Sequence, residues 1–165
     1  MRTIPLLTLV LAIAACGPNP AQISRARDAR YQGDPAAMFQ AAEQAAAGEN
    51  YKIDDQDADT HAFVTANRMF GPEGDLETQG AGGFTQMRDR SIVLQYQVRI
   101  VPVDHAFAVE ITPHIQRAFV DRPNTDELPA DDPSVPGWVH GRTDQLTVAV
   151  HDALAAYEVK APPAP

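Results

Sequence analysis

The chain has 165 residues, with 13 Lys and Arg against 22 Asp and Glu, a formal net charge of −9 and a single cysteine. This acidic balance, without a cluster of basic residues, argues against a nucleic acid as partner. Residues 16–165 are enough for one domain with one hydrophobic core, and we find no internal repeat.

The first fifteen residues are typical of an export signal. Met1 and Arg2 give a short basic start, and the segment from Ile4 to Ala15 is almost entirely apolar. As a helix this segment would be about 18 Å long, whereas the hydrocarbon core of a bilayer is about 30 Å thick. It is too short to span the bilayer as a helix, so we predict that residues 1–15 are a signal peptide that is removed.

The end of this segment, Ile13-Ala14-Ala15-Cys16, resembles the lipobox of bacterial lipoproteins. The resemblance implies that diacylglycerol is attached to the Cys16 sulfur and that the chain is cleaved just before this residue. Gly17 stands where an aspartate would indicate retention in the inner membrane, so we expect an outer-membrane anchor facing the periplasm. The alternative is ordinary secretion after Ala14, which would leave Cys16 unpaired in an oxidising compartment.

The remaining chain divides into three parts. Residues 16–33 contain glycine and proline without sustained apolar periodicity, so they are predicted to be the lipidated cysteine and a flexible tether. A single domain is expected over residues 34–158, followed by a proline-rich tail over residues 159–165 that cannot pack as a helix.

A helix is predicted at the start of the domain. Asp34 can cap free backbone amides, and Pro35 fits the first helical position. The helix is expected to end near Gly48 and to bury Met38 and Phe39 together with several alanines.

Four strands are expected next. Tyr51–Asp57 and His61–Phe70 are predicted to be two strands joined by a polar turn. The clearest alternation of apolar and polar residues runs from Ile92 to Val101, and a fourth strand follows from Phe107 to Ile115. Pro113 interrupts this last strand, which predicts a sheet edge or a bulge.

A second helix is predicted near the C-terminus, from apolar residues spaced three and four apart, with Gly141 favouring a start after that position. The order α-β-β-β-β-α predicts an α+β fold, in which two helices pack on one face of an antiparallel sheet of about four strands. The core of this fold is expected to bury the following residues together: Leu94, Val98, Ile111, Leu146, Val150 and Leu154.

The spacings Phe39-x-x-Ala42-Glu43-x-Ala45, Tyr51-x-Ile53-x-x-x-Asp57 and Phe63-Val64-Thr65 resemble the helix-grip domain of BamC-like outer-membrane lipoproteins. The resemblance covers about residues 34–158. It implies a non-enzymatic scaffold or accessory protein at the outer membrane, with an envelope protein as partner.

Motifs for metal binding and catalysis are incomplete. Asp55, Asp57 and Asp59 begin like a calcium loop, but Thr60 replaces the glycine of the turn and Ala66 replaces the closing glutamate, so we expect a solvated hairpin turn instead. The five histidines form no short-spaced ligand pair. We find no nucleophile motif and no phosphate loop. The sequence therefore predicts neither an enzyme nor a bound cofactor or metal.

The segment from Gly71 to Arg90 is the candidate contact surface. It is long and lacks periodicity, and such loops are usually either functional or disordered. Its possible partner contacts are Leu76, Phe84, Met87 and Arg88. A disordered insertion is the alternative for this segment. For the whole domain, the alternative to an interaction module is a periplasmic carrier that binds a small apolar ligand between sheet and helices.

Overall fold

The computed structural model describes residues 17–76 and 87–159. It is an α+β fold in which a six-stranded antiparallel sheet is covered by helices on one face. The strands are β1 (Ile53–Asp57), β2 (Ala62–Thr65), β3 (Arg68–Phe70), β4 (Ser91–Val103), β5 (Ala106–Ala118) and β6 (Asp126–Leu128). The helices are α1 (Pro20–Asp28), α2 (Pro35–Gly48) and α3 (Gly137–Ala153), with a short 3-10 turn, η1 (Ala155–Tyr157).

The long hairpin of β4 and β5 forms the centre of the sheet. The two strands pair over their whole length, from Ser91 opposite Ala118 to Val103 opposite Ala106. Because side chains alternate between the faces of a strand, every second residue of β4 points to the helices and is buried there. These buried residues are Ile92, Leu94, Tyr96, Val98 and Ile100.

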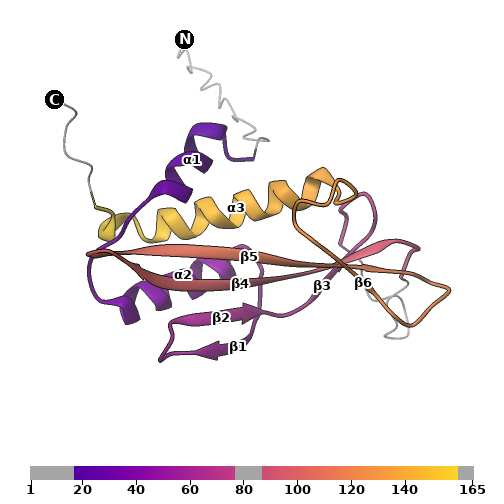
Figure 1. Ribbon diagram of the computed structural model, residues 1–165, viewed down its shortest axis with the longest axis horizontal. Coiled ribbons are helices and arrows are strands. Elements are labelled where there is room, and N and C mark those ends of the chain that lie inside the picture. The colour runs from indigo at the N-terminus through magenta and orange to yellow at the C-terminus, as the bar shows by residue number, and fades with distance from the viewer. Residues whose placement is uncertain (1–16, 77–86, 160–165) are drawn as a thin grey trace, which may run out of the picture.

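Two helices cover that face. In Figure 1, α2 and α3 lie against the sheet, and α1 lies outside α3 as a third layer. Asp34 caps α2 through a 3.1 Å hydrogen bond from the Ala36 amide, as predicted. The opposite face of the sheet carries no described helix. Its middle is polar, with Gln95, Gln97, Thr112, His114 and an exposed Arg99–Glu110 pair, whereas Val93 and Val101 lie nearer its ends.

The prediction for His61–Phe70 is wrong in part, because this segment forms two strands. β2 and β3 both pair with the same edge of β4, but the chain leaves that edge between them. The Ala66 amide turns away and donates to the Lys52 carbonyl at 2.7 Å. The hydroxyl of Thr65 then accepts the hydrogen bond of the Tyr96 amide at 2.9 Å, so a side chain replaces the backbone partner.

The sheet also gains a sixth strand, because β6 pairs with the end of β5 at residues 115–117. The predicted count of about four strands and two helices was therefore too low, although the α+β class is confirmed. Along residues 108–114 of β5, no described strand pairs on the outer side, and Pro113 lies in this stretch. The prediction of an edge at Pro113 is thus confirmed, because a proline lacks the amide hydrogen that a further strand would need.

The predicted tether over residues 16–33 is wrong for residues 20–31, which belong to the fold. α1 has a complete capping box, in which Asn19 and Gln22 exchange hydrogen bonds of 3.0 and 2.9 Å. Ala26 and Ala29 are buried, and the Tyr31 backbone pairs with Phe107 of β5. This helix was hard to predict, since it buries small residues and shows no wide apolar stripe.

The core is closely filled. Of the six residues predicted to be buried together, five are 0 to 1% exposed, and only Ile111 is half-buried. α3 begins at Gly137 rather than after Gly141, which extends its contact with the sheet by one turn. Among the described residues, no helix has the length and apolar character that crossing a membrane requires.

Candidate functional site

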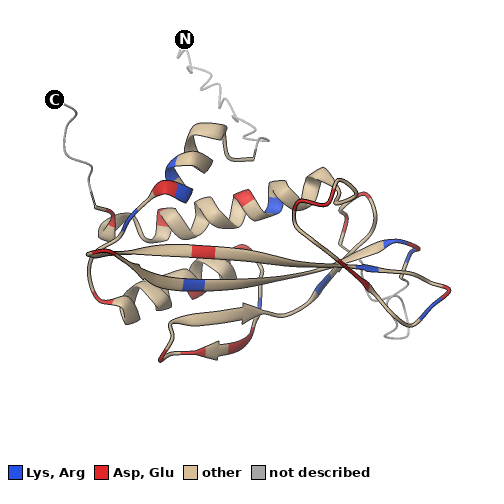
Figure 2. Cartoon of the chain, viewed as in Figure 1, with Lys and Arg blue, Asp and Glu red and all other residues tan. Residues whose placement is uncertain are grey.

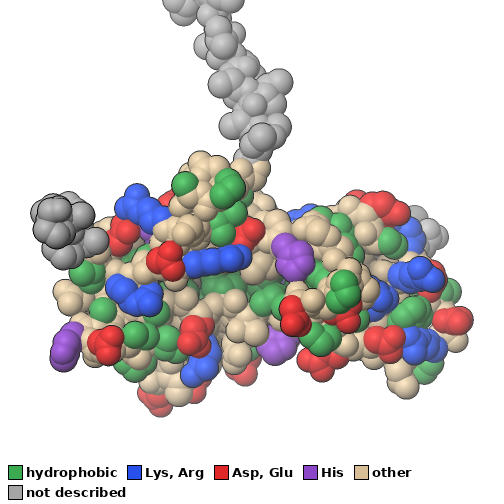
Figure 3. Space-filling model, turned by 45° about the horizontal axis from the view of Figure 1, so that its top comes forward, with side chains coloured by type: hydrophobic (Ala, Val, Ile, Leu, Met, Phe, Trp, Pro, Cys, Tyr) green, Lys and Arg blue, Asp and Glu red, His purple; other side chains and the backbone are tan. Residues whose placement is uncertain are grey.

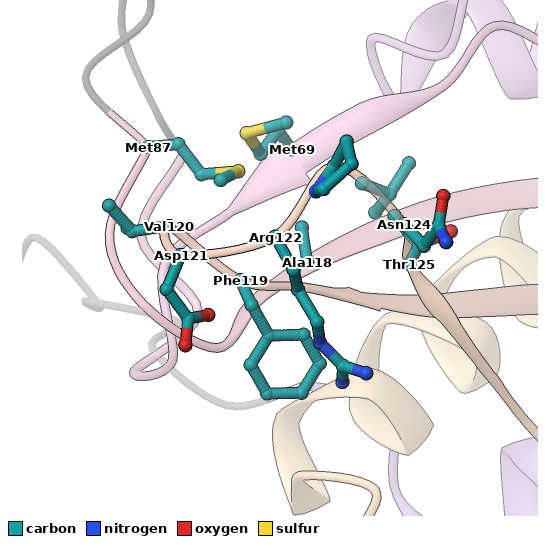
Figure 4. Close-up of a pocket in the computed structure, with 11 residues that line it drawn as sticks. Met69, Met87, Ala118, Phe119, Val120, Asp121, Arg122, Asn124 and Thr125 are labelled. Atoms are coloured by element: carbon teal, nitrogen blue, oxygen red, sulfur yellow. The ribbon is translucent and has the colours of Figure 1, made fainter.

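An apolar groove lies on the uncovered face of the sheet, at the end away from η1. It has a volume of about 550 Å³, and residues from four separate segments line it. Figure 4 shows these residues, which are Met69, Met87, Val93, Ala118 and the segment Phe119–Thr125.

The floor of the groove follows from strand register. Met69 of β3 lies opposite Val93 of β4, and both point to the uncovered face because their neighbours Phe70 and Ile92 point into the core. The Met87 side chain extends toward Met69 across the groove in Figure 4. Methionine side chains adapt easily to the shape of a bound apolar group.

The rim is a loop whose arginine has two partners. The Arg122 guanidinium lies 3.8 Å from the centre of the Phe119 ring and 2.5 Å from the Asp126 carboxylate. Next to this pair, Val120 is 62% exposed, the highest value among the large hydrophobic side chains of the described residues. The arrangement can bind an apolar group by contact, since its one lining arginine already has two partners.

The neighbouring turn, residues 71–75, is fixed to helix α3. The Trp138 indole donates to the Pro72 carbonyl at 3.0 Å, and Arg142 donates to the Gly74 carbonyl at 2.9 Å. Gly74 has a φ of +90°, and the Trp138 ring lies so close that a Cβ there would be 2.8 Å from it. Both the backbone angle and the close approach require glycine at this position.

Arg88 closes the base of the segment from Gly71 to Arg90. Its guanidinium lies 2.6 Å from Asp75 and 3.1 Å from Glu73, directly above Gly71. The hydrogen bond from Arg88 holds the pKa of the Asp75 carboxyl below its ordinary value. Arg88 thus ties the two ends of this segment together.

The predicted contact residues do not form one surface. Met87 lines the groove, whereas Leu76 is 47% exposed outside it and Arg88 faces the acids of the turn. Phe84 and Cys16 lie outside the described residues. Within the candidate segment, residues 71–76 form a hydrogen-bonded turn against α3, and residues 77–86 lie outside the part of the chain that the structure describes.

Compared with protein-family models and with curated proteins, the chain shows no match. Its function must therefore be argued from the groove and from the N-terminal motif.

Sequence reasoning missed most of the groove. Phe119, Val120 and Arg122 fall in a segment that follows a strand and carries proline and aspartate, which is typical of any surface loop. A usable signal was Val93, an apolar residue on the largely polar side of the alternation from Ile92 to Val101. Its neighbour across the sheet could not be known before β3 was distinguished from β2.

The acidic segment after β1 is a hairpin turn, as predicted. Asp57 accepts hydrogen bonds from the amides of Asp59 and Thr60 at 2.9 and 3.2 Å. Hydrogen bonds from Thr60 hold the pKa of the Asp57 carboxyl below its ordinary value. Within residues 17–76 and 87–159, no group of three or more His, Cys, Asp or Glu side chains could hold a metal ion.

Proposed function

We propose that this chain is a lipid-anchored lipoprotein of the cell envelope that acts as a non-enzymatic interaction module. The lipobox-like motif ending at Cys16 supports the anchor and the expected place in the outer membrane, facing the periplasm. The partner is an envelope protein that inserts an apolar side chain into the groove beside β3.

The apolar groove is the observation that carries this proposal. Apolar side chains exposed around a concave surface are typical of a contact site for another protein. The groove offers Met69, Met87 and Val93 as a floor and the exposed Val120 at its rim. Its arginine is paired with Asp126, so recognition rests on apolar contact rather than on charge.

The carrier alternative is less well supported. A carrier of this fold would hold its ligand between the sheet and the helices. The side chains there, including Met38, Phe63, Tyr96 and Leu146, are 0 to 1% exposed and pack on one another. An apolar ligand would have to displace this packing.

The anchor is tested by Cys16→Ser. The variant is expected to lose metabolic labelling with palmitate and to move from the membrane pellet to the soluble fraction, because a buried acyl chain contributes about 0.8 kcal/mol per CH₂. A variant that remains in the pellet after a high-salt wash would show that lipid on Cys16 is not the anchor.

The groove is tested by a photo-crosslinking amino acid at position 120 and by Val120→Asp. We expect crosslinks to a discrete envelope protein from position 120 and loss of that protein from affinity purification of Val120→Asp. Val159→Asp is the matched control, since Val159 is also exposed, at 38%, but lies outside the groove. Equal loss of the partner in both variants, or in neither, would contradict a contact at the groove.

A further inference from the structure

The fold leaves almost no free chain between Cys16 and the folded domain. Asn19 is already fixed, because its side chain and amide both bond to Gln22 in the capping box of α1. Only Gly17 and Pro18 lie between Cys16 and Asn19. Three residue steps span at most about 11 Å, even when fully extended.

α1 itself is held to the rest of the molecule by charged contacts. The Arg25 guanidinium donates to both carboxylate oxygens of Glu158, at 3.1 and 2.6 Å. On the opposite flank, Arg27 donates to Asp144 of α3 at 2.7 Å. These contacts join residues more than a hundred positions apart, so α1 cannot act as a swinging tether while they are in place.

The segment after α1 is fixed as well. The Tyr31 amide and carbonyl exchange hydrogen bonds of 2.9 and 2.8 Å with Phe107 of β5, and the Val159 amide donates to the Arg30 carbonyl at 2.8 Å. Tyr31 is 1% exposed, and burial raises the pKa of its phenol to about 12. The connection from Asn19 into the sheet is therefore continuous folded structure.

α1 carries exposed arginines, whereas a cluster of aspartates lies at the far edge of the sheet. Arg25 and Arg27 keep side-chain exposures of 65 and 62% although each has an acidic partner. Four aspartates lie at the other edge of the sheet, on β1 and its hairpin, as Figure 2 shows; they are Asp54, Asp55, Asp57 and Asp59. β1 is three strand spacings from β5, or about 14 Å.

From this geometry we infer that the domain rests directly on the bilayer, with the exposed side of α1 against phospholipid headgroups and the acidic β1–β2 hairpin directed away. The inference depends on the proposed lipidation of Cys16. A diacylglycerol on that sulfur places Cys16 at the headgroup layer, and the short connection then holds the first turn of α1 within about 11 Å of it. Figure 3 shows the side that bears α1, where basic and acidic side chains are interspersed. Anionic headgroups attract exposed arginines and repel the aspartates of the far edge.

The test uses the lipidated full chain in vesicles of phosphatidylethanolamine and phosphatidylglycerol. A fluorophore is attached through Ala21→Cys in the first turn of α1 or, as matched control, through Ala58→Cys in the hairpin. Both alanines are exposed, and Cys16 is the single native cysteine, with its sulfur occupied by lipid. Quenching by nitroxide-labelled headgroups is expected to be several-fold stronger at position 21 than at position 58. Equal quenching at the two positions would overturn the inference.

A second variant separates connection length from other causes. A Gly-Ser linker of about twelve residues, inserted between Pro18 and Asn19, gives a mean reach of about 20 Å and should abolish most of the difference. If position 21 is still quenched much more strongly than position 58 after the insertion, the short connection is not the cause of the orientation. Mass spectrometry of the N-terminal peptide reports lipidation separately, so a chain without diacylglycerol refutes the proposed anchor itself. Melting curves of the labelled variants check that each is folded.

Discussion

Single residues fix the turn that borders the groove. Gly74 combines a positive φ with a close approach to the Trp138 ring, and its own carbonyl and that of Pro72 accept hydrogen bonds from α3. Gly141, in contrast, lies inside α3 at an exposed position where a Cβ would meet nothing within 4 Å. The same substitution should therefore have opposite effects at these two glycines.

We predict that Gly74→Ala destabilises the protein by about 1–3 kcal/mol, because the alanine must adopt a strained backbone and displace the Trp138 ring. Gly141→Ala should stabilise it by up to about 1 kcal/mol, because alanine is the better helix former. Urea denaturation measures both effects. Trp138 is the one tryptophan of the chain, so its emission should shift in Gly74→Ala alone. If Gly74→Ala leaves the free energy of unfolding unchanged, the turn is not held against the Trp138 ring.

At the scale of elements, α1 is the part whose attachment depends most on charge. Its apolar contribution is small, since Ala26 is the one buried residue of the helix. Glu158, which lies after η1, accepts two hydrogen bonds from Arg25 and also lies 3.6 Å from His151. The hydrogen bond from Arg25 is the main cause that holds the pKa of the Glu158 carboxyl below its ordinary value.

A depressed carboxyl pKa means that the folded state favours the charged form. The stability from this pair is therefore present above the ordinary glutamate pKa of 4.5 and is lost as the pH falls through the lower pKa of the folded state. We predict that Glu158→Gln lowers the urea midpoint at pH 7 and that the difference from the parent chain shrinks steadily as the pH is lowered below 4.5.

Glu110→Gln is the control for this prediction, because the Arg99–Glu110 pair is 3.7 Å apart and half-exposed on the uncovered face of the sheet. Exposed pairs of this kind contribute about 0–1 kcal/mol, so the midpoint should change little at any of these pH values. If Glu158→Gln lowers the urea midpoint by the same amount at every pH, the ion pair is not the source of the lost stability.

The molecule as a whole is stabilised by one core between the sheet and the helices. Leu146 of α3 is 0% exposed there, whereas Leu76 is 47% exposed in the turn beyond β3. We predict that Leu146→Ala costs about 2–5 kcal/mol in the free energy of unfolding, from lost burial and the cavity left behind. Leu76→Ala should cost well under 1 kcal/mol, as measured by chemical denaturation. Comparable losses in the two variants would contradict the position of the core.

Features that depend on one segment at a time could be predicted from the residues of that segment. The alternation from Ile92 to Ile100 predicts the buried face of β4, and Asp34-Pro35 predicts the start of α2. Pro113 predicts a sheet edge or a bulge, because the missing amide hydrogen is a property of that residue alone. The expected signal peptide and lipid attachment at Cys16 also rest on a short contiguous motif, and they stay predictions.

Features that depend on residues distant in the chain appear only in the folded molecule. α1 is held by partners at positions 144 and 158, which no local pattern in residues 17–33 reveals. β3 and β6 have three residues each, too few for a periodic signal, and are extended because β4 and β5 offer hydrogen bonds. The groove unites positions 69, 87, 93 and 118–125. A local pattern indicates which side of one segment faces water and which faces the core. The contacts of α1, β3, β6 and the groove depend instead on the free energy of the whole folded chain.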